Sequence, residues 1–146
     1  MNKHKGFTLI ELLIVIAIIG IISTVVLSSL SESQQRAYDT KIAQQLIGFR
    51  TGAQVYFTNH TGYGPETTSC GEGMFNTVDP QDGSPGLYIA AGALPDFSDV
   101  YCGTNANGTA YAVKATLYSG SEYWCVDNKG TSRKITGVPT SGFFCP

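Results

Sequence analysis

The chain has 146 residues, of which 42% are hydrophobic and 14% are charged, and its formal net charge is −2. This slightly acidic balance, without a clustered basic run, does not predict a nucleic-acid-binding surface. The sequence has no glycine-rich phosphate loop and no Gly-x-Ser-x-Gly motif, and His60 falls in a cluster of helix-stopping residues. We therefore expect no enzyme, no cofactor and no catalytic residue.

The first element is an apolar run over residues 7–30, in which Glu11 is the only ionisable side chain. As a helix, 24 residues rise about 36 Å, which exceeds the roughly 30 Å hydrocarbon core of a bilayer. Lys3 and Lys5 precede the run and keep the N-terminus cytoplasmic by the positive-inside rule. A carboxylate in such a helix is costly to insert and is usually retained because it has a partner. Residues 7–30 are thus a predicted transmembrane helix in which Glu11 has a function.

The junction before this run predicts how the chain is processed. A secretory signal is cut after its apolar segment, near small residues, whereas here the predicted break lies before the segment, between Gly6 and Phe7. The heptapeptide Gly-Phe-Thr-Leu-Ile-Glu-Leu at residues 6–12 resembles the prepilin signature of type IV pilins and of type II secretion pseudopilins. The resemblance covers about residues 5–30, where Gly20 also matches, and continues more loosely to about Tyr63. Many pilins have a proline late in the apolar segment, but this chain has none there, so no kink is expected.

This resemblance implies that residues 1–6 are a leader peptide. A membrane peptidase would remove the leader and N-methylate Phe7, and an inner-membrane platform would assemble many copies into a filament. In the family, the residue at the position of Glu11 is thought to meet the N-terminus of a neighbouring subunit. We favour a type IV pilus on the cell surface, and a periplasmic pseudopilus is the alternative. The remaining alternative is a plain signal-anchored protein whose Glu11 only snorkels to the membrane interface.

The second half of the helix is predicted from residue spacing. After a polar patch at residues 31–36, apolar side chains recur at spacings of four or three and form one stripe: Tyr38, Ile42, Leu46, Phe49, Ala53 and Tyr56. Because no glycine or proline interrupts residues 21–47, we expect the transmembrane helix to continue as an amphipathic helix over residues 31–58. The stripe should pack on a sheet. The sequence Asn-His-Thr-Gly-Tyr-Gly-Pro at residues 59–65 then ends the helix.

Residues 59–146 are the predicted exported head. Residues 59–108 are rich in glycine, proline, aspartate, asparagine and serine, so they are expected to form a long loop region with one short strand at residues 87–89. Alternation around Tyr111, Val113 and Ala115 predicts a half-buried strand. Two further strands at residues 122–126 and 131–135 complete a predicted three-stranded antiparallel sheet over residues 109–135. The fold class is therefore α+β, with a long N-terminal helix packed on a small antiparallel sheet, the lollipop plan of pilins.

The four cysteines, Cys70, Cys102, Cys125 and Cys145, all lie in the exported part. An even number of cysteines in a small extracytoplasmic domain predicts two disulfides. Of the three possible pairings we favour Cys70–Cys102 with Cys125–Cys145, because each pair closes within one local unit of the chain. A zinc site is the weaker interpretation, because there is no Cys-x-x-Cys and the only exported histidine is His60.

The basic leader that ends at Gly6 generates the first testable prediction. We expect a mature N-terminus at Phe7, carrying an added methyl group, because the peptidase must approach the backbone closely and glycine allows that approach. Intact-mass analysis of the chain purified from membranes measures this. A mass that retains residues 1–6, or one that shows a cut after Leu30, would contradict the processing assignment.

Overall fold

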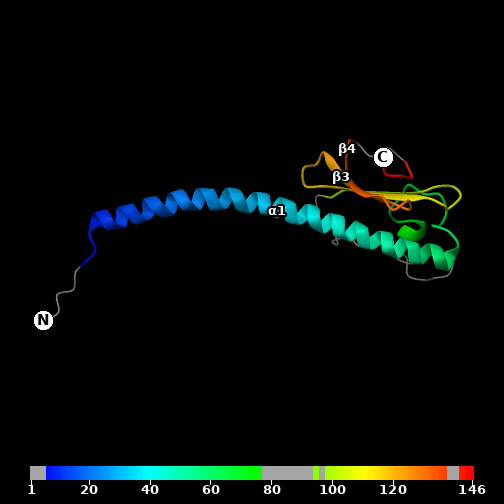
Figure 1. Ribbon diagram of the computed structural model, residues 1–146, viewed down its shortest axis with the longest axis horizontal. Coiled ribbons are helices and arrows are strands. Elements are labelled where there is room, and N and C mark those ends of the chain that lie inside the picture. Colours follow the sequence, from blue (N-terminus) through cyan, green and yellow to red (C-terminus); the bar gives the residue numbers. More distant parts are fainter. Residues whose placement is uncertain (1–5, 77–93, 96–97, 138–141) are drawn as a thin grey trace. The chain divides into compact units, whose positions relative to one another are not determined.

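The structure is a computed structural model. It describes residues 6–76, 94–95, 98–137 and 142–146. It contains one long helix, one short 3-10 helix and four strands within these ranges (Figure 1). The elements are α1 (Leu9–His60), η1 (Gly73–Phe75), β1 (Val100–Thr104), β2 (Tyr111–Thr116), β3 (Glu122–Asp127) and β4 (Ser132–Thr136). The chain divides into two compact units, Met1–Arg36 and Ala37–Pro146, and α1 contributes to both.

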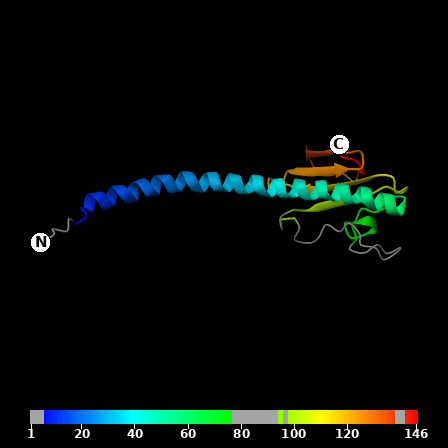
Figure 2. The same cartoon turned by 60° about the horizontal axis from the view of Figure 1, so that its bottom comes forward.

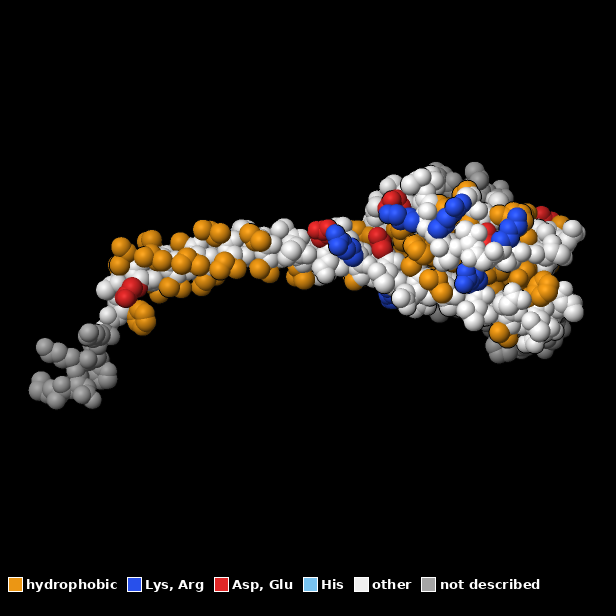
Figure 3. Space-filling model, in the orientation of Figure 1, with side chains coloured by type: hydrophobic (Ala, Val, Ile, Leu, Met, Phe, Trp, Pro, Cys, Tyr) orange, Lys and Arg blue, Asp and Glu red, His pale blue; other side chains and the backbone are white. Residues whose placement is uncertain are grey.

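The described part of the N-terminal unit contains the first half of α1. Every large apolar side chain in residues 7–30 is at least half exposed, from Val15 at 50% to Phe7 at 91%. Figure 3 shows apolar side chains along the visible face of this segment. Among the described residues, α1 is the helix that is long and apolar enough to cross a bilayer. A helix that is apolar all around requires lipid or other helices as its surroundings.

In the C-terminal unit, the second half of α1 buries one face against the sheet. Five of the six side chains of the predicted stripe are buried: Ile42, Leu46, Phe49, Ala53 and Tyr56. This confirms the stripe, apart from Tyr38, which is 41% exposed and stacks on Tyr118 at 6.0 Å between ring centroids. The carboxylate of Asp39 also accepts a 2.8 Å hydrogen bond from the backbone N–H of Tyr118. The helix ends at His60, two residues beyond the predicted end.

The sheet is antiparallel, with strand order β1-β2-β3-β4, and it lies along the second half of α1 (Figure 2). The predicted count of three strands is wrong, because β1 lies inside the expected loop region 59–108. This strand has only five residues and includes Gly103, which has no side chain to pack, so it showed no strand pattern. Hydrogen bonding to β2 stabilises this strand although its own sequence does not favour one. In this pairing Cys102 lies opposite Val113. The short strand predicted at residues 87–89 lies outside the described residues.

The prediction of a half-buried β2 is also wrong, because all six of its residues are buried. Val113 faces the α1 side and joins the main core with Leu46 and Phe75. Lys114 faces the other side, where it lies opposite Cys125. The C-terminal segment is attached to that outer face through the Cys125–Cys145 disulfide.

Phe143 adds to this cover, since its ring lies 3.4 Å from where a Cβ on Gly103 would be. The glycine in β1 therefore makes room for an aromatic ring on the outer face.

Two disulfides connect the sheet to the loops on its opposite faces. Cys70 is bonded to Cys102, 32 residues away, and Cys125 is bonded to Cys145, 20 residues away. This is the pairing favoured from the sequence, in which each pair closes within one local unit of the chain. Cys70 and Cys102 belong to the core on the α1 side, whereas Cys125 and Cys145 belong to a separate outer cluster with Tyr123 and Ile135. Each disulfide therefore connects a loop segment to one face of the sheet.

Glycine allows a close approach where the end of α1 meets the loop between β1 and β2. The backbone N–H of Tyr63 donates a 2.7 Å hydrogen bond to the carbonyl of Gly108. Gly108 has a φ of +62°, and a Cβ there would lie 2.8 Å from the carbonyl oxygen of Gly64. Both the backbone angle and the contact exclude a side chain at this position.

This approach predicts that Gly108→Ala destabilises the head strongly. Gly120→Ala is the matched control, because Gly120 has a φ of +72° but open space where the Cβ would lie. The control should lower the free energy of unfolding by about 1 kcal/mol, from the left-handed backbone alone. Gly108→Ala should lower it by at least about 3 kcal/mol, because the steric clash with Gly64 adds to the backbone cost. Denaturant unfolding in detergent, followed by the fluorescence of the single tryptophan, Trp124, measures both. Equal losses would show that the contact with Gly64 is unimportant.

The outer disulfide predicts that Cys145→Ser lowers the free energy of unfolding by about 2–4 kcal/mol. Without the bond the unfolded chain gains conformational entropy, and the C-terminal segment is no longer bonded to the outer face of the sheet. Non-reducing peptide mapping of the parent should recover Cys125 joined to Cys145. The difference in stability between parent and variant should largely disappear in excess reductant, which opens the bond in the parent as well. A difference that persists unchanged in reductant would show that the Cys145 side chain acts by packing and not by its bond.

Candidate assembly site

The candidate site lies at the start of α1, where Glu11 occupies the first helical turn. One of its carboxylate oxygens, Oε2, accepts two hydrogen bonds of 2.8 Å from Thr8, one from the backbone N–H and one from the hydroxyl. The Thr8 hydroxyl in turn accepts the backbone N–H of Glu11 at 3.3 Å. This reciprocal arrangement is a capping box, which satisfies donors that the first turn of a helix leaves unpaired.

Sequence reasoning missed this cap, although its signal was present. Thr8 and Glu11 are three residues apart directly before an apolar run, which is the pattern Thr-x-x-Glu of a capping box. The cap uses only Oε2. The other carboxylate oxygen, Oε1, has no hydrogen bond to any residue that the structure describes. Glu11 is therefore held in a defined position and still has one oxygen available to a further donor.

The remaining polar side chains of residues 7–30 are all satisfied within the helix. Each is a hydroxyl that donates to a backbone carbonyl three or four residues earlier, at 2.8–3.0 Å: Ser23, Thr24, Ser28 and Ser29. Such bonds remove the need for water, which an apolar environment cannot supply. In this segment, Oε1 of Glu11 is thus the side-chain polar atom that has no hydrogen bond to a described residue.

The two residues at the predicted cleavage point precede the helix. Gly6 and Phe7 have no assigned secondary structure, and both are exposed. A Cβ built on Gly6 meets no atom within 4 Å, and Phe7 is 91% exposed. The peptide bond between them lies in open, non-helical chain, which is the form in which a peptidase can bind a substrate backbone.

Other ionisable groups of the head have structural contacts. Asp127, 1% exposed, accepts the backbone N–H groups of Lys129 and Thr131 at 2.9 Å and that of Cys145 at 3.0 Å. His60 stacks on Tyr56 at 4.0 Å between ring centroids and lies at the helix end. Within the described ranges no three His, Cys, Asp or Glu side chains gather in a way that could hold a metal ion. All four cysteines are in disulfides.

Comparison with protein families matches residues 1–27 to the prokaryotic N-terminal methylation motif. The match includes the predicted cleavage point, Thr8 and Glu11. No solved structure matches the chain significantly.

Curated relatives include proteins named type IV pilins. The chain is 39% identical over 86 residues to the type IV major pilin protein PilE1 of Neisseria gonorrhoeae, which covers 59% of this chain and 49% of that protein. It is 41% identical over 63 residues to the type IV wide pilus major component PilA4 of Thermus thermophilus, covering 43% of this chain and 48% of that protein. The matches thus span about half the length of these relatives. The methylation motif and these partial matches show that the chain is similar to type IV pilins, most clearly at its N-terminus.

Proposed function

We propose that this chain is a structural subunit that polymerises into a type IV pilus after a prepilin peptidase removes residues 1–6. The observation that carries the proposal is the methylation motif at residues 1–27, joined to a helix whose apolar side chains are exposed on all sides. The similarity to proteins named type IV major pilins supports the pilus as the product. The proposed role is architectural, and no catalytic residue takes part in it.

Before assembly, the subunit is a membrane-anchored precursor in this proposal. Residues 7–30 cross the inner membrane, Lys3 and Lys5 remain on the cytoplasmic side, and the head is exported. The internal hydrogen bonds of Ser23, Thr24 and their neighbours support this placement, since lipid offers no partner to a hydroxyl. Export also supports the disulfides, because oxidising compartments form and preserve them.

In the filament, residues 7–30 leave the lipid and need another apolar environment. Neighbouring copies of the same segment provide one, because each exposes aliphatic side chains around its whole circumference. Burying one such side chain is worth about 1.5–3 kcal/mol relative to water, so exposure of the segment to water is strongly disfavoured. Head-to-tail contacts that do not close into a ring generate a helical filament. Platform proteins in the inner membrane would extract and add the subunits.

Glu11 gives the assembly its register in this proposal. Cleavage after Gly6 converts the neutral backbone N of Phe7 into a positively charged amine. A buried carboxylate without a cationic partner is costly in an apolar bundle. Because the Thr8 cap occupies only Oε2, the free Oε1 of Glu11 can accept the Phe7 amine of a neighbouring subunit. The apolar contacts alone would allow many axial positions, and this pair selects one.

The proposal predicts that Glu11→Val abolishes most fibre formation without impairing membrane insertion. Removing a charge that costs about 3 kcal/mol in a transmembrane helix should even ease insertion. Glu11→Asp should be intermediate at best, because the shorter side chain keeps the charge but not the reach. The measurement is the yield of sheared fibres relative to the amount of processed subunit in the membrane.

Glu11→Gln separates capping from assembly. A glutamine at this position of a capping box still accepts the Thr8 donors but carries no charge. We expect Glu11→Gln to be nearly as defective as Glu11→Val, whereas Thr8→Val, which weakens the cap and keeps the carboxylate, should retain much more fibre. If Glu11→Gln cells made normal fibre, Glu11 would act as a helix cap and not as a charge partner. Normal fibre from Glu11→Val would leave only the snorkelling interpretation.

A further inference from the structure

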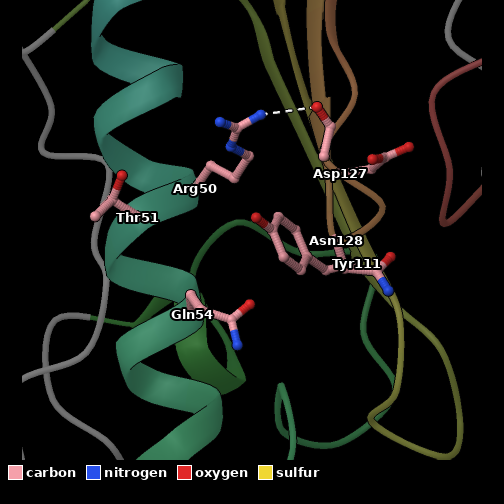
Figure 4. A pocket seen from close by; sticks show the side chains of 7 residues that line it. Arg50, Thr51, Gln54, Tyr111, Asp127 and Asn128 are labelled. Atoms are coloured by element: carbon pink, nitrogen blue, oxygen red, sulfur yellow. Dashed lines mark hydrogen bonds between the residues drawn. The ribbon is translucent and has the colours of Figure 1, made fainter.

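The C-terminal unit contains a recess of about 310 Å³ that the proposed assembly does not use. Arg50 and Gln54 of α1 line one side, and Tyr111 of β2 and Gly130 of the turn after β3 line the other. Figure 4 shows the Arg50 guanidinium and the Tyr111 hydroxyl extending toward the same space from helix and sheet. This volume lies at the lower end of the range of about 300–1,000 Å³ that is usual for small-molecule sites.

Tyr111 presents an unsatisfied hydroxyl to this recess. The residue is 1% exposed, and its hydroxyl has no hydrogen-bond partner among the residues that the structure describes. Its ring is fixed by edge contacts with Tyr63, at 4.7 Å between ring centroids, and with Phe49, at 6.1 Å. Burial raises the pKa of the phenol well above its usual value, so the group remains a protonated donor. Buried polar groups normally have a partner, and this one has a space in front of it.

Arg50 adds a positive charge next to that hydroxyl. Its Nη1 donates a 2.8 Å hydrogen bond to the carbonyl of Gly130, which holds the guanidinium beside the recess. A guanidinium has five N–H donors, so most of them are left for another acceptor. Arg50 has no ion pair with any carboxylate that the structure describes. The Gln54 side chain, one helical turn from Arg50, lies at the edge of the recess and carries both a donor and an acceptor.

The acidic residue that lines the recess does not neutralise Arg50. The carboxylate of Asp127 is engaged by three backbone N–H groups of its turn and of the C-terminal segment. Figure 4 shows its oxygens turned away from Arg50, and the Asn128 amide likewise turns away and donates to the carbonyl of Thr109 at 3.1 Å. Arg50 is thus the charged group that faces the recess, and the Tyr111 hydroxyl adds a neutral donor.

We propose that this recess binds a carboxylate group, with Arg50 and Tyr111 as its hydrogen-bond donors. A planar carboxylate matches the fork of a guanidinium, and the Tyr111 hydroxyl can donate to one of its oxygens. The nearby charge of Asp127 disfavours a doubly charged anion such as a phosphate. The carboxylate can come from a dissolved small molecule or from an acidic side chain of a neighbouring copy.

The chemistry is tested on the full, unassembled chain in detergent micelles, so this test does not depend on the proposed function. Acetate is titrated at constant ionic strength against chloride, and ¹H–¹⁵N NMR follows the Gln54 side-chain amide and the Gly130 backbone amide. We expect saturable shifts with acetate and not with chloride. Tyr111→Phe and Arg50→Gln should each weaken the affinity about tenfold. Lys41→Gln, which removes one positive charge elsewhere on α1, is the matched control and should bind acetate normally.

Tyr111→Phe is the sharper variant, because it removes only an atom without a partner. It should fold with unchanged or slightly higher stability in the absence of acetate. Equal shifts with acetate and chloride, or unchanged acetate affinity in Tyr111→Phe, would overturn the proposal. Assembled fibres then distinguish the two sources. Fibres that bind acetate like the unassembled chain indicate a dissolved carboxylate. Fibres that no longer bind acetate, and that dissociate more readily when they carry Arg50→Gln, indicate a neighbouring copy.

Discussion

The continuity of one helix is the constraint on which both units depend. The same 52-residue element is apolar around its whole surface up to Leu30 and apolar on one face from Ile42 onward. The first pattern requires lipid or neighbouring helices as its environment, whereas the second requires a sheet on one side and water on the other. Hydrogen bonds along the helix satisfy its backbone in both environments. No separate linker is therefore needed where the apolar segment ends and the head begins.

The head shows how a small domain compensates for a limited core. One helical face and a four-stranded sheet provide the main core, and the sheet then has a second face that would be open to water. The C-terminal segment covers part of that face through Phe143 and Cys145, and the buried carboxylate of Asp127 accepts the N–H of Cys145. Domains of this size commonly need such covalent support. The disulfides are thus part of the way in which both sheet faces are closed.

Patterns of hydrophobicity predicted the parts of this fold that depend on local sequence. The stripe from Ile42 to Tyr56 and the strands β2, β3 and β4 were visible because packing repeats at a regular spacing. Strand β1 was not visible, because its stability comes from pairing with β2 and from the bond between Cys102 and Cys70. The outer cover of β2 was missed for the same reason, since it depends on contacts between distant parts of the chain. The orphan hydroxyl of Tyr111 could not be foreseen, because a strand pattern does not show where a buried oxygen points.

The cap at Glu11 changes how its proposed role in assembly should be understood. A free glutamate side chain in an apolar helix would sample several rotamers, and fixing it during assembly would cost conformational entropy. Thr8 already fixes it through Oε2, so this cost falls on folding of the helix and not on the contact between subunits. The partner also exists only after processing, because an uncleaved chain has a neutral amide at Phe7. In the proposed function, a preorganised acceptor and a newly formed cation therefore make removal of the leader a chemical condition for correct register.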